Sequence, residues 1–376
     1  MARRIASHLM LIDGHLEPNM ILTLDDSGRI LAIEREENID RCAGVEFYSG
    51  VIIPGMINAH CHLELSYLRG AIEEQTGFAG FAREIGRCRT LYSDEERRRK
   101  ALNADARMWE EGVQAVADIA NDRLVMDIKA KSKIEYSTLF EFFGLQRTSL
   151  DEHLQMVQEP RSSITPHSIY SVQDEPMRRI CSMGDTPLSL HFLESDDESL
   201  LYQGRGSLAE WYERMGWECD FLHYGTPSQR IAESIPSSRR VMLIHACKAT
   251  AEDVEILDKH FAGTLTWVLC PESNRYISRL SPPVDMLRKM GARIAIGTDS
   301  LASARHLSMI DNMRQLGDIA LDELAVWATE NGAKALGRDA DLGHFAVGKS
   351  PGVVLIEGVD LHNHKLTEES FSRRLL

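Results

Sequence analysis

Five titratable side chains stand at the ends of apolar runs in this sequence, and their types are those that bind divalent metals. His60 and His62 close one run, His191 and His245 close two later runs, and Asp299 follows a fourth. Imidazole nitrogens and carboxylate oxygens are common zinc ligands. Side chains at positions i and i+2 of an extended strand point to the same side, so His60 and His62 can share one cation. The pattern predicts a metal centre.

Two histidines around one residue are a weak signal by themselves. The chain contains a second triplet of this kind, His362-Asn363-His364, in a polar stretch near the C-terminus. The alternative for His60 and His62 is that they are core or surface histidines at a strand end. The Pro54-Gly55 turn upstream of them and the distant acid and base groups favour a metal site. The specificity therefore comes from the combination of motifs.

The elements that must position these groups are alternating strand-like and helix-like segments. This alternation, from about residue 50 to about residue 335, is typical of βα units and a parallel sheet. Eight such units predict a (β/α)8 TIM-like barrel over residues 51–339, with an open doubly wound sheet as the alternative. In a barrel the active site gathers at the carboxyl ends of the strands, where all five titratable groups fall. The candidate strands include residues 51–53, 113–119, 139–143, 163–167, 188–191, 241–245, 265–269 and 294–297.

The two ends of the chain have a different pattern. Residues 21–24 and 29–33 are short apolar runs separated by an Asp-Ser-Gly turn, which indicates an antiparallel hairpin. Residues 352–356 form a further β-like run after Lys349-Ser350-Pro351. We therefore expect residues 1–50 and 340–376 to form one small β-sandwich beside the barrel.

Charge and cysteine content limit the classes of partner and the compartment. A formal net charge of −15 disfavours nucleic acid and anionic membrane surfaces as partners. The basic run at residues 97–100 follows three acidic residues and is interpreted as a solvated helix face. Seven cysteines without a CxxC pair favour a reducing compartment. No apolar run reaches the roughly 18 residues of a spanning helix, so we predict a cytoplasmic protein.

The segment Pro54-Gly55-Met56-Ile57-Asn58-Ala59-His60-Cys61-His62-Leu63-Glu64, together with residues 191–194, His245 and residues 297–300, resembles the amidohydrolase superfamily in its cyclic deaminase and chlorohydrolase branch. The resemblance covers nearly the whole chain. It implies one divalent metal, most readily Zn²⁺ with Fe²⁺ as the alternative, which would lower the pKa of bound water towards about 7. The ligands that the resemblance implies are His60, His62, His191 and Asp299.

The resemblance also implies roles for three catalytic side chains. Glu194 would move a proton from the water to a ring nitrogen of the substrate, and Asp299 would deliver a second proton to the leaving amine. His245 would stabilise the charge that develops on the attacking oxygen. Residues 162–168 lack the lysine that bridges two metals in binuclear relatives, so a single metal is expected. The alternatives are a solvated carboxylate for Glu194 and a structural histidine for His245.

Residues 62–66, 165–170, 270–274 and 298–303 are similar to aminodeoxyfutalosine deaminases, which hydrolyse the 6-amino group of an adenine nucleoside in menaquinone biosynthesis. Glu272 departs from that family, in which a basic residue is commoner. Glu64, His167 and Asn274 are the candidate substrate contacts. The alternatives are a chlorohydrolase, a deaminase of guanine, cytosine or a triazine, or a non-catalytic scaffold. Barrels of this type are often homodimers, so a homodimer is a further expectation.

Overall fold

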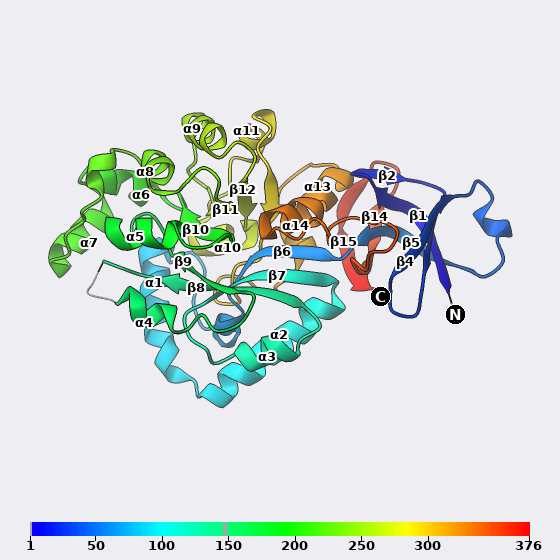
Figure 1. Cartoon of the computed structure of the whole chain (residues 1–376), viewed down its shortest axis with the longest axis horizontal. Coiled ribbons are helices and arrows are strands. Elements are labelled where there is room, and N and C mark those ends of the chain that lie inside the picture. The colour runs from blue at the N-terminus through cyan, green and yellow to red at the C-terminus, as the bar shows by residue number, and fades with distance from the viewer. Residues whose placement is uncertain (1, 146–148) are drawn as a thin grey trace.

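The computed structural model describes residues 2–145 and 149–376, which form a barrel of parallel strands and a separate sheet built from both ends of the chain. In Figure 1 the barrel and its helices lie to the left, and the terminal sheet lies to the right with both chain ends. This architecture agrees with the sequence-based prediction of a barrel flanked by a small β domain.

Two four-stranded parallel sheets make up the barrel. Hydrogen bonds along their carboxyl ends connect them through parallel bridges, Ser168 to His191 on one side and Cys61 to Asp299 on the other. These bridges complete a ring of eight strands and confirm the predicted TIM-like fold. The strands are β6 (Met56–Cys61), β7 (Val113–Ala120), β8 (Glu135–Phe142), β9 (Ser162–Pro166), β10 (Leu188–Phe192), β11 (Val241–His245), β12 (Leu265–Leu269) and β13 (Ile294–Ile296).

The barrel strands are nearly continuous apolar runs because helices cover their outer faces while side chains from the opposite strands fill the interior. Every residue of β6, β7 and β11 is buried. Ile57 and Ala115 pack in one cluster with Ile244 and Val268 from the other half of the barrel. The strands are therefore held rigidly, which fixes the positions of the residues at their carboxyl ends.

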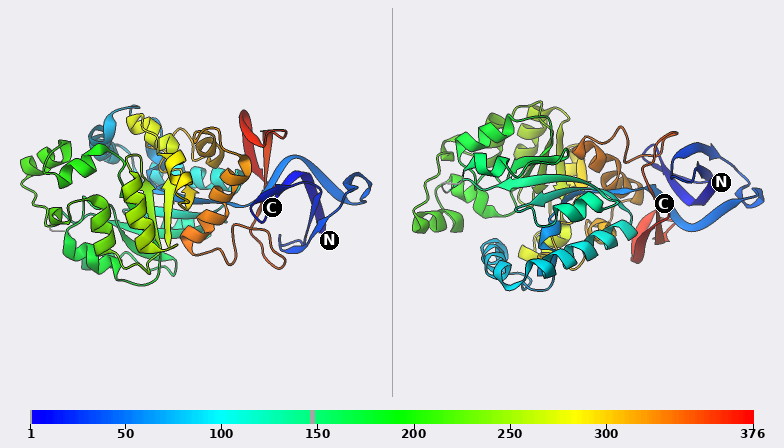
Figure 2. Two further views of the ribbon diagram at one scale, coloured as in Figure 1. Left: turned by 90° about the horizontal axis from the view of Figure 1, so that it is seen from above. Right: turned by 60° about the horizontal axis from the view of Figure 1, so that its bottom comes forward.

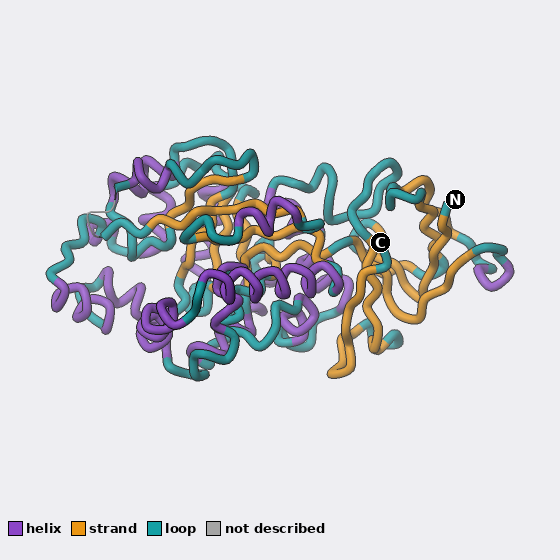
Figure 3. The backbone as a smooth tube through the Cα atoms, turned by 90° about the horizontal axis from the view of Figure 1, so that it is seen from below, coloured by secondary structure: helices purple, strands orange, loops and turns teal. Residues whose placement is uncertain are grey.

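Helices surround the strands, as the purple and orange segments of Figure 3 show. Two of these helices begin with a capping box, Ser93 with Glu96 and Thr250 with Asp253. The α-helices are α1 (Gly77–Cys88), α2 (Asp94–Glu110), α3 (Met126–Lys131), α4 (Leu150–Leu154), α5 (Asp174–Cys181), α6 (Asp196–Tyr202), α7 (Ser207–Met215), α8 (Pro227–Ser234), α9 (Ala251–Phe261), α10 (Pro271–Ser278), α11 (Val284–Lys289), α12 (Met309–Arg314), α13 (Leu321–Ala328) and α14 (Glu330–Leu336). Four 3-10 helices are η1 (Ile39–Arg41), η2 (Leu63–Leu68), η3 (Arg89–Leu91) and η4 (Leu222–Tyr224). Within the described part of the chain, none of these helices has the length and apolar character needed to cross a membrane.

The terminal sheet joins strands from both ends of the chain. Its order is β15-β14-β5-β1-β3-β4, with β2 paired to β1. The expected hairpin is present as β3 and β4, and the expected pairing of the two chain ends is present as β14 against β5. The strands form one continuous sheet, which curls around an apolar core (Figure 2). They are β1 (Arg3–Ile12), β2 (His15–Glu17), β3 (Met20–Leu24), β4 (Ile30–Arg35), β5 (Val45–Pro54), β14 (Val353–Asp360) and β15 (Lys365–Arg374).

One predicted strand belongs to a different sheet from the one expected. Residues 51–53, expected at the start of the barrel, lie in β5 of the terminal sheet, and the first barrel strand is β6. Gly55 lies between the two strands. A side chain would not fit there, because a Cβ would stand 2.6 Å from both Gln114 Cβ and the Pro351 carbonyl oxygen. Residues 50–61 are all buried, so their apolar character alone could not locate this crossing between sheets.

Candidate active site and metal centre

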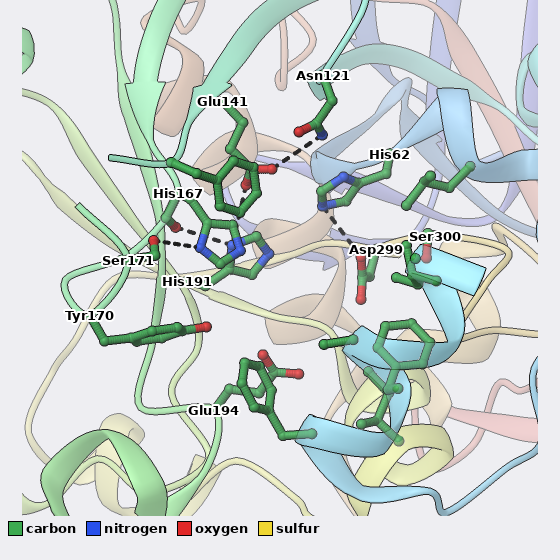
Figure 4. A pocket seen from close by; sticks show the side chains of 18 of the residues that line it. His62, Asn121, Glu141, His167, Tyr170, Ser171, His191, Glu194, Asp299 and Ser300 are labelled. Carbon is green, nitrogen blue, oxygen red and sulfur yellow. Dashed lines mark hydrogen bonds and ion pairs between the residues drawn. The ribbon is translucent and has the colours of Figure 1, made fainter. Parts of the chain in front are cut away.

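The four predicted metal ligands converge at the carboxyl end of the barrel, and Figure 4 shows His62, His191 and Asp299 around the cavity. The Asp299 carboxylate oxygen Oδ1 stands 3.6 Å from His62 Nε2 and 3.9 Å from His60 Nε2. The ring centroids of His60 and His191 are 5.1 Å apart. All four side chains are buried. Residues separated by about 240 positions in the chain therefore meet in one small volume.

The donor set fits a divalent cation. The ligand atoms of His60, His62 and Asp299 lie within 4.8 Å of one another, and those of His60, His191 and His245 form a second such group. Both ring nitrogens of His60 and Nδ1 of His62 are buried without a hydrogen-bond partner among the described residues. A buried polar atom left unpaired is costly, and a cation shared by these imidazoles would remove that cost.

The protonation states suit metal binding. Burial, together with the neighbouring imidazoles of His62 and His191, holds the pKa of His60 well below its usual value. Burial also lowers the pKa of His62 to about 3. The same burial would raise the pKa of Asp299, but the nearby imidazoles of His62 and His245 bring it below its usual value. Neutral imidazoles and an ionised carboxylate are the forms that bind a metal.

Asp299 is held in place by contacts whose role the sequence did not reveal. Its Oδ2 atom accepts hydrogen bonds from Ser273 Oγ at 2.5 Å and from Ser303 Oγ at 3.0 Å, which leaves Oδ1 facing the histidines. The backbone at Asp299 is left-handed, with φ at 56°, and its N–H donates to the His60 carbonyl at 3.0 Å. Strained backbone of this kind concentrates at functional sites, where the surrounding contacts maintain it. Ser273 and Ser303 lie in the motifs at residues 270–274 and 298–303, but the sequence did not predict that they contact Asp299.

Contacts at its Nδ1 atom orient the imidazole ring of His191. Its Nδ1–H donates to the His167 carbonyl at 3.2 Å, and the Glu141 carboxylate lies 3.5 Å from the same nitrogen. This arrangement leaves Nε2 free to bind a metal. Burial raises the pKa of Glu141 to about 8. The ligand atoms of Glu141, His167 and His191 lie within 4.8 Å of one another, so this group is a third, adjacent combination of possible metal ligands.

Glu194 and His245 face each other beside the metal ligands. His245 Nδ1 accepts a hydrogen bond from Asn274 Nδ2 at 2.9 Å, so the ring proton belongs on Nε2, which stands 3.8 Å from Glu194 Oε2. Burial raises the pKa of Glu194 to about 7. The Glu198 carboxylate accepts the N–H groups of Leu193 and Glu194, each at 2.7 Å. A buried acid with a pKa near neutrality is suited to proton transfer.

The predicted substrate contacts have different positions. His167 lines the cavity above the metal ligands, as Figure 4 shows. Glu64 lies behind Asn121 and accepts its N–H at 2.8 Å and its side-chain amide at 3.0 Å. Asn274 is buried against His245. Contacts from these three residues to a substrate stay predictions, and for Glu64 and Asn274 the observed partners favour positioning roles.

The cavity has a volume of about 470 Å³ and two chemically distinct parts. Its floor contains titratable groups, and its outer wall is apolar and largely aromatic. The floor is formed by His62, Glu141, His167, His191, Glu194, His245 and Asp299. The wall includes Leu65, Phe78, Phe81, Ile85, Trp211 and Trp217, from η2, α1, α7 and the segment that follows α7.

Arg89 is the arginine that lines the cavity, and its charge acts on His62, Glu64 and Glu141. Within the described chain its guanidinium has no hydrogen-bond or ion-pair partner, unlike Arg87 on the same stretch, which pairs with Glu84. Sequence reasoning did not identify Arg89 or the wall. The aromatic residues of α1 and α7 have the spacing of an ordinary helical core face, so no local signal separates a cavity wall from a packed core.

Comparison with known proteins places this site in a family. The model of the amidohydrolase family matches residues 51–374. The chain belongs to the amidohydrolase family. The barrel, the hydrolytic type of activity and the dependence on a metal that were expected from the resemblance are thereby confirmed.

Relatives and solved structures of similar proteins include several deaminases. A 5-methylthioadenosine/S-adenosylhomocysteine deaminase of Teredinibacter turnerae is 26% identical over 340 residues, which cover 83% of this chain and 72% of the relative. The Helicobacter pylori aminofutalosine deaminase in complex with methylthio-coformycin has a TM-score of 0.79 and 22% identity, covering 94% of this chain and 92% of that one. An atrazine chlorohydrolase of Arthrobacter aurescens complexed with zinc has a TM-score of 0.75 and 17% identity, covering 93% and 86%.

Proposed function

We propose that this enzyme is a metal-dependent aminohydrolase that replaces the 6-amino group of an adenine-type nucleoside with oxygen and releases ammonia. The observation that carries this proposal is the position of Glu194 and His245 beside the cluster of His60, His62, His191 and Asp299, on the floor of one cavity. The relatives' names support a nucleoside as the substrate class.

The proposed metal ligands are His60, His62, His191 and Asp299. When bound there, a divalent cation such as Zn²⁺ would acidify a water molecule and polarise the reacting carbon. The unpaired nitrogens of His60 support this assignment. The preference for zinc over iron rests on the ligand types, since imidazole and carboxylate suit zinc well.

The reaction needs two proton transfers, and the site has an acid group for each. Glu194 takes a proton from the attacking water and gives it to the adjacent ring nitrogen, so that the amidine carbon becomes electrophilic. The Nε2–H of His245 donates to the attacking oxygen as its negative charge develops. Asp299 accepts the second water proton and passes it to the amino group, which leaves as ammonia. One water molecule is thus consumed: its oxygen replaces the amino group, one of its protons stays on the ring nitrogen of the product, and the other leaves with ammonia.

The substrate that we propose is 6-amino-6-deoxyfutalosine, an adenine nucleoside whose 5′ substituent ends in a benzoate. Its aryl group matches the aromatic wall formed by Phe78, Phe81, Trp211 and Trp217, and its carboxylate matches the unpaired guanidinium of Arg89. The cavity volume of about 470 Å³ is large enough for such a molecule, since pockets for drug-sized ligands span roughly 300 to 1,000 Å³. The similarity in fold to the aminofutalosine deaminase also supports this choice.

The proposal is tested by measuring ammonia release by the zinc-loaded enzyme on 6-aminodeoxyfutalosine, adenosine, 5′-methylthioadenosine, guanine, cytosine and a chlorotriazine. We expect 6-aminodeoxyfutalosine to have the highest kcat/KM. Turnover of the chlorotriazine alone would replace the deaminase with a chlorohydrolase, and no turnover of any purine nucleoside would overturn the proposal.

A pair of variants separates the substrate assignment from the reaction type. Arg89→Met removes the proposed carboxylate contact, and Arg87→Met is the matched control because that side chain is exposed and paired with Glu84. Loss of one charge-assisted hydrogen bond should lower kcat/KM for 6-aminodeoxyfutalosine about tenfold or more. The same variant should leave 5′-methylthioadenosine, which has no carboxylate, nearly unchanged. An equal loss on both substrates would contradict the carboxylate contact.

A further inference from the structure

A second cleft, about 280 Å³ in volume, lies between α2, the segment that begins at η2, and the loop that follows Asp299. Four cationic side chains line it: Arg69, Lys100, Arg107 and Arg305. The chain has a formal net charge of −15, so a gathering of cations around one cleft is opposite in sign to the rest of the protein. Glu111 is the acidic side chain that lines it.

Two of these cations are neutralised and two remain available. Arg107 pairs with Glu111 at 2.7 Å, and Arg305 pairs with Glu74 at 2.9 Å. Lys100 has no ion pair or hydrogen bond among the described residues. Arg69 contacts only an imidazole there, through a hydrogen bond from Nη2 to His306 Nδ1 at 3.3 Å.

The basic run of α2, residues 97–100, contributes Lys100 to the lining of this cleft but not its other three residues. Arg97 pairs with Asp94 and Asp122, and Arg98 pairs with Asp127. Both arginines are half-buried, so the interpretation of a fully solvated helix face does not hold for them. Lys100 instead faces the cleft. The run is therefore part surface and part lining of a site.

A buried hydroxyl adds an independent observation. Ser66 lines the cleft, is 1% exposed, and its Oγ has no hydrogen-bond partner among the described residues. A buried hydroxyl without a hydrogen-bond partner costs free energy, so a ligand that accepts a hydrogen bond from it would be favoured. Burial and the guanidinium groups of Arg107 and Arg69 lower the pKa of His306, which keeps that ring neutral beside them.

We propose that this cleft binds a phosphate-class oxyanion, either inorganic phosphate or a phosphate monoester. Arg69 and Lys100 supply charge-assisted donors, Ser66 supplies a neutral donor, and a tetrahedral oxyanion has enough acceptor oxygens for all three. The chemistry shared by the two ligand sources is the phosphoryl group.

The cleft is connected to the metal centre through the chain. Ser66 lies in η2, four residues after His62, and Arg305 follows Asp299 in the same loop as Ser303. A bound anion would join the two segments that carry metal ligands. We expect it to slow the release of the metal, an effect that does not depend on which substrate the enzyme uses.

The test is isothermal titration of the full-length, zinc-loaded protein with inorganic phosphate and, separately, with ribose 5-phosphate, each against chloride at equal ionic strength. We expect saturable binding of one phosphate per chain. The double variant Arg69→Gln/Lys100→Gln should weaken it about tenfold or more, since each residue supplies a charge-assisted hydrogen bond. Arg99→Gln, which removes one charge from the neighbouring position of α2, is the matched control and should bind as the wild type does.

Several outcomes would contradict the proposal of a phosphate site in this cleft. Absence of binding would do so, and so would equal weakening in Arg99→Gln, which would indicate only general electrostatic attraction. Unchanged binding in the double variant would place the anion elsewhere, for example at the metal. Tighter binding of ribose 5-phosphate than of phosphate would assign the cleft to a phosphate monoester, and the reverse order would assign it to the inorganic ion. These measurements do not use enzymatic activity, so their result is independent of whether the proposed reaction is correct.

Discussion

The chain contains two histidine triplets with identical spacing, and the structure places them in opposite environments. His60 and His62 lie at the buried carboxyl end of β6, and neither ring nitrogen of His60 has a hydrogen-bond partner within residues 2–145 and 149–376. His362 and His364 lie in the turn between β14 and β15, where His362 is exposed. The Asp360 carboxylate accepts the backbone N–H of His362 at 3.0 Å, so that acid serves the turn.

The difference shows what the spacing of two histidines does and does not determine. Along a strand, the alternation of side chains brings positions i and i+2 to one face, but in a turn it does not. The barrel adds His191 and Asp299 from other strands, because parallel strands bring their carboxyl ends together. We therefore expect metal binding to require both a strand that brings the two histidines to one face and neighbouring barrel strands that supply the other ligands. The spacing of the two histidines is not sufficient by itself.

Removal of one histidine from the buried triplet should have the largest effect. His60→Ala should reduce bound zinc to a small fraction of one ion per chain and lower kcat by at least about a thousandfold, since the metal generates the nucleophile. Elemental analysis and ammonia release measure the two effects. Full metal content in a folded His60→Ala protein would contradict the assigned ligand set.

The next variant separates metal binding from proton transfer. Glu194→Gln keeps the shape of the side chain but cannot accept a proton, so kcat should fall about 10²-fold to 10⁴-fold. Zinc content should remain that of the wild type, because Glu194 is not among the proposed ligands. A variant with near-normal turnover would remove Glu194 from the mechanism.

The raised pKa of Glu194 predicts the pH dependence of the reaction. Burial raises this pKa to about 7, and the ionised carboxylate is the form that accepts a proton from water. As the pH falls below about 7 the carboxylate becomes protonated, so kcat/KM should fall about tenfold per pH unit. Stopped assays between pH 5 and pH 9 in zinc-loaded enzyme test this, and a flat profile down to pH 5 would contradict the assignment.

A smaller effect is expected from Glu198, which holds the backbone of the loop that carries Glu194. Its carboxylate accepts two N–H groups, but a glutamine would present an amide nitrogen to one of them. Glu198→Gln should therefore cost about 1–3 kcal/mol in the free energy of unfolding. It should lower kcat more than it changes KM, because the substrate contacts remain. Urea denaturation and steady-state kinetics measure both, and an unchanged kcat would show that the loop does not depend on Glu198.

The triplet in the turn should give the smallest effect. His362→Ala, at an exposed position, should change the free energy of unfolding by no more than about 0.5 kcal/mol. His364 is half-buried and has a left-handed backbone, with φ at 52°, so His364→Ala tests only zinc content and kcat. Zinc content and kcat should match the wild type. Loss of metal in either variant would mean that the spacing alone is sufficient, against the comparison drawn above.

The sequence could predict the barrel, and which side chains converge at its carboxyl end, because their signals are local. Buried parallel strands are short apolar runs, and each proposed ligand stands at or just after the end of such a run, as His191 and Asp299 illustrate. The capping boxes at Ser93 and Thr250 are local for the same reason.

The remaining features depend on contacts between distant segments. Residues 51–53 and 56–61 are equally buried, and the close packing of Gly55 between them against Gln114 and Pro351 involves segments distant in the chain. The wall formed by α1 and α7 has the helical spacing of a core, and its exposure to the cavity follows from where these helices pack. The same holds for the basic cleft, whose lining comes from segments far apart in the chain.

The number of zinc ions bound per chain decides whether the four proposed ligands form a mononuclear metal centre. Elemental analysis after zinc loading and extensive dialysis should give one ion per chain, held by His60, His62, His191 and Asp299. Two ions would mean that the adjacent group of Glu141, His167 and His191 also binds a metal, and the mononuclear account would be wrong. A metal-free protein with full ammonia-releasing activity would contradict the account altogether.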